Sequence, residues 1–379
     1  MKVAINRLNK MLSKNIILFS IVTVCFVTSM LFVQFNYSFY DRPIAKIIEI
    51  NLKDSVQVVD MHNNRDELFT QHIIAQIKNG QEKGQQIHIS NNYSTSGAYD
   101  HAFRVGNELF VSIDKQTKDS RDLTGSISNV KRDKYILMIM WVFIFVLLLI
   151  GKKQGFFSIV SLAVNALLLS FALDVYVNNS TISLLWICGI TIILFTVTSL
   201  LLVNGFNEKA YAAIVATLLG TFISLLISYL VIWITAGNGL RYEEMNFLTR
   251  PYEMVFMAGL FVGSLGAVMD VAITMSSSIF GLYEKDNNIS TKALTKSGLE
   301  IGKDIMGTMT NILFFAYISG SIPAIILYIK NHTSLSFALS MNLSLELARA
   351  LAGGIGIVLA IPIGLYTSIF FVNRKRHKL

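Results

Sequence analysis

One carboxylate lies in the middle of a long apolar stretch. The stretch LFVGSLGAVMDVAITMSSS runs over residues 260–278, and Asp270 is near its centre. An ionised carboxylate placed in hydrocarbon costs about 2.5–3.5 kcal/mol on insertion scales. Such a side chain is either a structural clamp that hydrogen-bonds a neighbouring helix, or part of a path for a proton, an ion or a substrate. The sequence leaves both interpretations open.

Small and polar residues share one helical face with this carboxylate, because they recur at intervals of three or four. They are Gly259, Gly263, Gly266, Asp270, Thr274 and Ser277. Gly259 and Gly263 form a G-x-x-x-G pattern, which lets another backbone approach closely. We therefore expect the three glycines to pack against a neighbouring helix. Asp270 should face protein or a water-filled cavity instead of lipid.

The next apolar segment offers further polar groups on one face, namely Asp304, Thr308 and Asn311. Asn165 and Asn342 also lie at or near membrane depth. Taken alone, each is more often structural than functional. Together they predict a helical bundle with a polar interior, which is typical of transporters and channels. The predicted intramembrane site comprises Asp270, Thr274, Ser277, Asp304, Thr308 and Asn311.

Motifs for catalysis, cofactors and metals are absent from the sequence. There is no G-x-x-x-x-G-K-[ST], no H-E-x-x-H and no paired Cys-x-x-Cys. His62, His72, His88 and His101 fall in one polar segment near carboxylates, but their spacing fits no known ligand pattern. No nucleophile–base–orienter set is visible either. We therefore expect no cofactor, no metal and no enzymatic activity; an enzyme acting on lipid inside the membrane is the weakest alternative.

The composition predicts an integral membrane protein. Of 379 residues, 53% are hydrophobic and only 15% are charged, against about 25% charged in soluble domains. The apolar residues form long blocks separated by short polar loops, which indicates a multipass α-helical bundle. The net charge of +8 reflects basic residues at the ends of these blocks, so we do not expect nucleic-acid binding.

Eight membrane spans are predicted, and the first is read as an uncleaved anchor because no small-residue cleavage pattern follows it. The chain then divides into a terminus with this anchor (1–35), a polar domain (36–134), a seven-helix membrane domain (135–372) and a basic tail (373–379). The spans cover residues 16–35, 135–150, 156–173, 182–203, 210–236, 252–282, 305–329 and 348–372.

Lysine and arginine set the expected orientation. Most of those outside the polar domain fall on the side of the N-terminus, and only Arg241, Arg250, Lys330 and Arg349 fall on or beside the opposite loops. By the positive-inside rule both termini are then cytoplasmic, and residues 36–134 lie outside. A bacterial cytoplasmic membrane is the predicted location.

The outside segment has the pattern of a small β domain. SVQVVD, IIAQIKNG, QQIHIS and NELFVSI are short runs rich in valine and isoleucine. Gly80, Gly84 and Gly106 indicate turns between them. A small barrel, OB-like among other topologies, accounts for the pattern.

Several long stretches resemble the bacterial YibE/F family of multipass membrane proteins. They are LGAVMDVAITMSSSIFGLYE (265–284), SGLEIGKDIMGTMTNILFFAYISGSIP (297–323), ELARALAGGIGIVLAIPIG (346–364) and, in the outside segment, IKNGQEKGQQIHISN and FRVGNELFV. Lys303 stands where the family usually has arginine. The resemblance implies the architecture, with a longer form that carries the outside domain and a shorter companion that lacks it. It implies no substrate.

One region gives conflicting signals. Apolar residues alternate with small or polar ones from Leu335 to Leu347, which predicts a strand. The resemblance implies that a helix begins near Asn342. The structure of residues 333–341 is left open.

The leading functional hypothesis is a permease or exporter component with a polar route past Asp270. The alternative is a non-transporting scaffold or receptor that recruits envelope partners. The expected partners are the lipid bilayer and either the shorter companion protein or a second copy of this chain.

Overall fold

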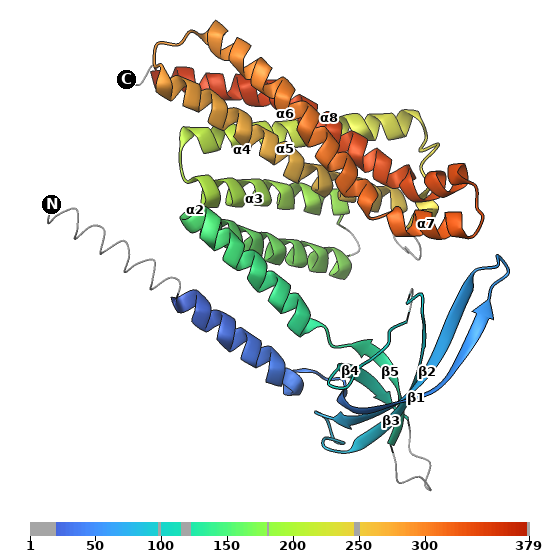
Figure 1. Ribbon diagram of the computed structural model, residues 1–379. Helices are drawn as coiled ribbons and strands as arrows, with labels where there is room; N and C mark the ends of the chain where they lie inside the picture. The colour runs from blue at the N-terminus through green and yellow to red at the C-terminus, as the bar shows by residue number, and fades with distance from the viewer. Residues whose placement is uncertain (1–19, 98–99, 115–122, 180–181, 246–250, 377–379) are drawn as a thin grey trace, which may run out of the picture. The chain divides into compact units, whose positions relative to one another are not determined.

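The computed structural model describes residues 20–97, 100–114, 123–179, 182–245 and 251–376 (Figure 1). The chain forms two compact units, Met1–Val146 and Leu147–Leu379. Among the described residues, six helices are long and apolar enough to cross a membrane, or seven if two bent helices near the C-terminus form one span. The described part of the chain is therefore mainly a set of membrane-spanning helices with one small β domain, as the sequence predicts.

A closed five-stranded barrel forms the β domain, in the order β1-β2-β3-β5-β4. Its strands are β1 (Ile44–Val59), β2 (Arg65–Ile77), β3 (Gln86–Ser94), β4 (Glu108–Ile113) and β5 (Leu123–Val130). β3 and β5 are parallel, and the other pairs are antiparallel. Alternate residues such as Ile73, Ile87 and Leu109 fill the interior.

The predicted turns are confirmed, because Gly80, Gly84 and Gly106 all have positive φ angles, of 83°, 92° and 91°. Glycine has no Cβ to oppose that conformation. The sequence pattern missed β5. Its segment LTGSISNV has few large apolar residues, and a Cβ at Gly125 would lie 2.8 Å from Ile87 Cδ1. At this position β5 lies so close to its neighbours that only glycine fits. The strand is therefore marked by a glycine and not by alternating apolar residues.

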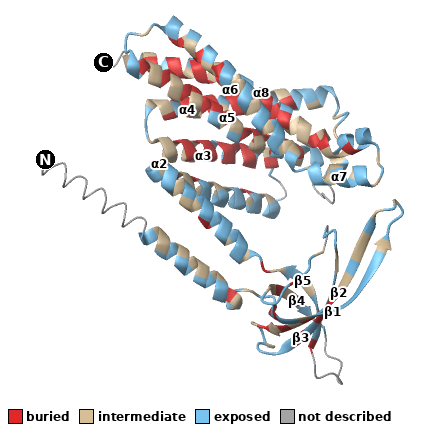
Figure 2. Ribbon diagram, viewed as in Figure 1, coloured by how far each residue is buried: buried red, intermediate tan, exposed pale blue. Residues whose placement is uncertain are grey.

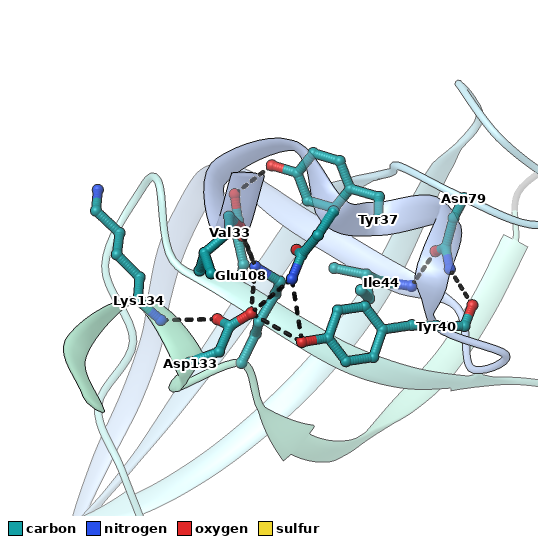
Figure 3. A network of polar contacts seen from close by, with 10 residues as sticks. Val33, Tyr37, Tyr40, Ile44, Asn79, Glu108, Asp133 and Lys134 are labelled. Carbon is teal, nitrogen blue, oxygen red and sulfur yellow. Dashed lines mark hydrogen bonds and ion pairs between the residues drawn. The ribbon is translucent and has the colours of Figure 1, made fainter. Parts of the chain in front are cut away.

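A polar network joins the barrel to the two helices that flank it (Figure 3). Its centre is Lys131, whose Nζ lies 3.3 Å from Glu108 Oε2 and 3.1 Å from Asp133 Oδ2. The same ammonium donates to the Val33 carbonyl at 3.0 Å, and its side chain is only 2% exposed. A buried ammonium needs such partners, because an unpaired charge away from water is costly.

Tyrosine hydroxyls complete this network. Tyr37 donates to Glu108, and Tyr40 donates to Asp133 Oδ2 at 2.8 Å. Both rings also face the Lys131 ammonium, with centroids 5.5 and 5.9 Å away. Burial and the hydrogen bond to Asp133 raise the pKa of Tyr40 above its ordinary value. The network therefore fixes where the helices leave the barrel.

The helix before the barrel (Ser20–Phe39 with its last 3-10 turn, η1, Asn36–Phe39) packs against the first part of α2 (Asp133–Asn178). Trp141 Nε1 donates to Ser29 Oγ at 2.8 Å, and Phe26 meets the Trp141 ring edge-on. Residues 1–19, which include the start of the predicted anchor, lie outside the described residues. The two helices beside the barrel thus pair with each other.

α2 is broken at Lys152, whose φ of 48° and ψ of −118° are not helical. A Cβ at Gly155 would meet the Leu147 carbonyl oxygen. In a straight helix these residues would be about 12 Å apart. The chain therefore folds back on itself at this break, between the segments predicted as two spans.

The second unit continues with α3 (Leu184–Asn204), α4 (Glu208–Ile234), the short η2 (Tyr242–Glu244), α5 (Tyr252–Lys285), α6 (Thr291–Ser319), α7 (Ile322–Lys330) and α8 (Leu335–Arg376). Figure 2 shows buried residues concentrated along α3, α4, α5 and α8. α8 packs against α4, α5 and α6. It is the helix around which this bundle is built.

Glycines allow these helices to pack closely. A Cβ at Gly356 of α8 would lie 2.7 Å from Val268 Cγ2 on α5 and 3.3 Å from Ser224 Oγ on α4. A Cβ at Gly220 of α4 would lie 3.0 Å from Val268 Cγ1. Three helices therefore meet at Val268 with no room for another methyl group.

One segment differs from the sequence prediction, and the structure assigns another that the sequence left open. Residues 283–304 fall between two predicted spans, but α6 begins at Thr291, where Ser290 caps it by accepting from the Ala293 N–H. Its first turns carry charged residues on the side that faces away from the bundle. Leu294, Gly298 and Gly302, at intervals of four, are buried on the other side. The open segment 333–341 is also helical from Leu335. There Ala338 and Leu345 are buried seven residues apart, which overrides the alternating pattern.

Replacing Lys131 with methionine should destabilise the protein by about 3 kcal/mol, because Glu108 and Asp133 would keep partly buried charges without a counterion. The control is Lys134→Met one turn away, at an exposed lysine. The thermal midpoint of detergent-purified protein should fall for the first variant only. Equal midpoints would mean that the network does not hold the junction.

Gly356→Val should lower the free energy of unfolding by about 1–3 kcal/mol, because the new methyl groups enter the contact with Val268 and Ser224. The thermal midpoint should fall accordingly. Gly259→Val is the matched control, since no atom of the residues that the structure describes lies within 4 Å of a Cβ placed there. A tolerant Gly356 would show that α4, α5 and α8 do not pack this closely.

Candidate functional site

The polar face predicted on α5 is the open side of that helix. Asp270 and the glycines at 259 and 266 are exposed, while Thr274 and Ser277 are half-buried. The opposite side, with Phe256, Leu260, Val268 and Met275, is buried against the bundle. The helix therefore turns its apolar side to α4 and α8 and leaves its small and polar side uncovered.

The three predicted packing glycines do not share one environment. A Cβ at Gly263 would meet the Tyr317 hydroxyl of α6, so this glycine does admit a neighbouring helix. At Gly259 and Gly266, an added Cβ would have no atom of the described residues within 4 Å. Of the three glycines, Gly263 alone makes the close contact that the G-x-x-x-G pattern predicts with a residue in the described part of the chain.

The polar residues of α6 are also exposed. Asp304, Thr308 and Asn311 lie on the uncovered side of the helix. The Thr308 hydroxyl donates to the Asp304 carbonyl oxygen at 3.3 Å, a bond within one helical turn. The half-buried residues Met306, Met309 and Leu313 pack against the core cluster instead. The uncovered side of α6 thus carries these polar groups together with exposed apolar residues, among them Ile312 and Phe315.

Two contacts fix how α5 and α6 lie against each other. Gly263 meets Tyr317 near one end, and a Cβ at Gly298 would lie 2.8 Å from Ile279 Cδ1 near the other. Between these contacts the helices advance about 24 and 28 Å at 1.5 Å per residue. Interpolating between them places Asp270 level with Thr308. The two polar faces are therefore at the same depth.

Asp270 has no hydrogen-bond or ion-pair partner among the residues that the structure describes, whereas Asn165 is fully engaged. Its Nδ2 donates to Ser199 Oγ at 2.7 Å, and its Oδ1 accepts from the Thr198 hydroxyl at 3.2 Å. Ser161 donates to the same Ser199 oxygen. Asn165 is thus a clamp between α2 and α3, and Asp270 differs from it.

The sequence analysis missed some residues of this region. The Tyr317 hydroxyl lies against Gly263, and it also interacts electrostatically with Arg349 and Glu346. Glu346 and Arg349, three residues apart on α8, form an ion pair, and the Arg349 guanidinium lies 5.4 Å from the Phe256 ring centroid. The i, i+3 spacing of Glu346 and Arg349 is a signal that could have found this pair, whereas a lone tyrosine in an apolar helix gives none.

Three polar groups, from α8, α6 and α5, lie at regular intervals along the axis of α5. Arg349 lies at the level of Phe256, Tyr317 at that of Gly263, and Asp270 one heptad further, about 10 Å at 1.5 Å per residue. An exposed carboxylate among small residues can accept a proton or hold a cation, and it can hydrogen-bond a cationic group. No group of three His, Cys, Asp or Glu side chains in the described ranges could hold a metal ion.

Two family models match this chain. The model for the YibE/F-like protein covers residues 139–374, and the model for the YibE/F family N-terminal domain covers residues 38–130. The chain belongs to the YibE/F family. Comparison of this family member with curated proteins and with solved structures gives no match. The matches confirm the resemblance that the sequence motifs carry. The N-terminal family domain covers the barrel, and the other model covers most of α2 and the helices that follow it.

Proposed function

We propose that this YibE/F protein is a permease or exporter component that moves a proton, a cation or a cationic substrate past Asp270. The observation that carries the proposal is the uncovered Asp270 on α5, level with Thr308 and without a partner in the described chain. A carboxylate at this depth needs water, a ligand or a second protein to solvate it. By contrast, Asn165 of α2 and Ser224 of α4 each make a hydrogen bond to another helix of the bundle.

The residues around Asp270 support a polar route along the helices, and not a single isolated carboxylate. Gly266 leaves space beside Asp270, since a Cβ there would meet no atom of the described residues within 4 Å. Asp304, Thr308 and Asn311 continue the polar face toward one end of α6, and Tyr317 lies toward the other. The glycines at 259 and 266 widen the path without adding apolar side chains. Their role is then to leave room for the substrate.

A scaffold that recruits partners is the second candidate, and the same uncovered face favours it. A companion helix, from a shorter relative or a second copy, would bury Asp270, Thr308 and Asn311 by hydrogen bonding. The two functions differ in whether the charge is needed. A hydrogen-bonding clamp works with an amide, whereas proton or cation transfer does not. We do not propose enzymatic activity, a cofactor or a metal.

The proposed topology has eight spans in the bacterial cytoplasmic membrane. It counts the two halves of α2 separately and treats α6 with α7, which are bent by 51°, as one broken span. Both termini are cytoplasmic. The barrel lies outside and is OB-like, which its strand order β1-β2-β3-β5-β4 supports.

The topology predicts different exposure of two loop positions. Cysteines introduced at Asn92 in β3 and at Asn288 between α5 and α6, in a background without native cysteines, should react differently with a membrane-impermeant thiol reagent. On intact cells the first should be labelled and the second protected until the membrane is opened. Labelling of both on intact cells would contradict the proposed orientation.

Asp270→Asn should keep near-normal membrane abundance but lose function, since the amide retains hydrogen bonding and removes the charge. The measurement is complementation of a deletion strain in a condition where the deletion slows growth, with a blot for protein level. Asp304→Asn is the matched control and should be milder, because Asp304 lies nearer the end of the membrane span.

Asp270→Glu should restore part of the function, because it keeps the charge. Full complementation by Asp270→Asn would make the residue a structural clamp and favour the scaffold. A fall in protein level with Asp270→Asn would likewise assign it to folding.

A further inference from the structure

The barrel carries a strand edge that nothing in the described chain covers. β1 pairs with β4 only at Ile44–Lys46, with further backbone hydrogen bonds at Ile47. Beyond that point β1 continues to Val59 and pairs only with β2. β1 and β2 thus form an arm that extends from the barrel (Figure 1). A bare strand edge is a template for another strand.

The other edge of this arm is covered. β2, at that edge, pairs with β3, and β3 pairs with β5 only at Ile87–Ile89. Beyond Ile89, residues that follow β3 in sequence lie against it. There Asn91 Nδ2 donates to the His101 carbonyl at 2.9 Å, and Ser94 Oγ donates to Asp100 at 2.9 Å. The fold therefore protects one edge by a loop and leaves the β1 edge open.

The hydrogen-bond pattern shows which backbone groups of β1 point outward. Glu67 of β2 accepts from the Thr95 N–H, so its backbone faces β3. Because the backbone groups of Glu67 face β3, they do not bond Gln57, the residue opposite Glu67 on β1. The backbone N–H and C=O of Gln57 therefore point away from β2. At the tip, the Asp60 N–H bonds the Asn64 carbonyl, which agrees with this alternation. Ser55, Gln57 and Val59 therefore direct their N–H and C=O groups away from the sheet.

This stretch lacks the features that usually prevent edge pairing. Register shifts interrupt β1 at Ile48 and Lys53, but the pairing from Asp54 to Val59 is regular. The stretch holds no lysine or proline, and Val56 and Val59 are each 59% exposed. The turn at its end is closed by hydrogen bonds, since the Asp60 carboxylate accepts from the Asn64 N–H and from Asn64 Nδ2, both at 2.8 Å. The edge is therefore regularly paired on one side and open on the other.

Charge indicates what could pair with it. Asp54 and Asp60 lie at the two ends of the stretch, and Asp66 and Glu67 lie on the next strand. The opposing charges are Lys53, next to Asp54, and Arg65. A second copy of β1 paired antiparallel about Gln57 would place Asp54 opposite Asp60 twice, which is repulsive. A partner strand with basic ends avoids that repulsion.

We propose that the β1 edge of the arm binds an extended polypeptide segment of a partner protein, with alternating β-branched residues between lysines or arginines. The segment adds a strand to the barrel sheet through the outward backbone groups of Ser55, Gln57 and Val59. Its side chains pack beside Val56 and pair with the acidic ends of the stretch. This inference does not depend on transport through the bundle.

The test uses the full-length protein in nanodiscs and a fluorescent peptide, Lys-Thr-Val-Thr-Val-Thr-Lys, with binding followed by anisotropy. Gln57→Pro removes an outward N–H without breaking a bond to β2. It should weaken binding about fivefold or more, as expected for the loss of a backbone hydrogen bond with added steric conflict. Gln57→Ala keeps the N–H and should bind like the unaltered protein.

A peptide with glutamates in place of the lysines should bind more weakly. A peptide N-methylated at the pairing amides should not bind unaltered protein, which tests the pairing even if Gln57→Pro fails to fold. Equal binding by Gln57→Pro and Gln57→Ala, or by the N-methylated peptide, would overturn strand addition. Disulfide-linked dimers of Gln57→Cys, in a background without native cysteines and undiminished by peptide, would assign the edge to a second copy.

Discussion

The membrane interior does not solvate polar groups, and this constraint explains most of the structure. Each polar side chain within the spans must find a partner in protein or in water. Asn165 finds Thr198 and Ser199, and Ser224 donates to the Ala352 carbonyl at 2.7 Å. Such bonds close the bundle at the positions where helices approach. Asp270 is the carboxylate that this rule leaves unexplained inside the described chain.

Close packing provides the frame for that residue. α8 lies against α4, α5 and α6, and glycines at the contacts bring backbones together where Val268 fills the gap. With its apolar side fixed in this way, α5 cannot rotate to bury Asp270. The helix that carries the polar face is therefore held rigidly while the face itself stays open. That combination suits a site that binds and releases a ligand.

The sequence predicted the membrane helices because long apolar blocks have no other stable fold in lipid. It also predicted that Asp270, Thr274 and Ser277 share a face, since helical spacing alone decides this. It could not predict that Gly259 and Gly266 stay open while Gly263 meets Tyr317, because spacing does not say which neighbour arrives. The start of α6 was missed since its first turns are charged on the outer side. β5 was missed because its closest contact is made at a glycine.

The account depends on water reaching Asp270. The direct measurement is the reactivity of Asp270→Cys, in a background without native cysteines, toward a small hydrophilic thiol reagent that reacts with the thiolate in water. Leu219→Cys is the control, because Leu219 is exposed on α4 beside Gly220, which meets Val268 at a similar depth. The account predicts rapid modification at 270 and none at 219. A folded protein in which neither cysteine reacts would contradict a polar route through this face.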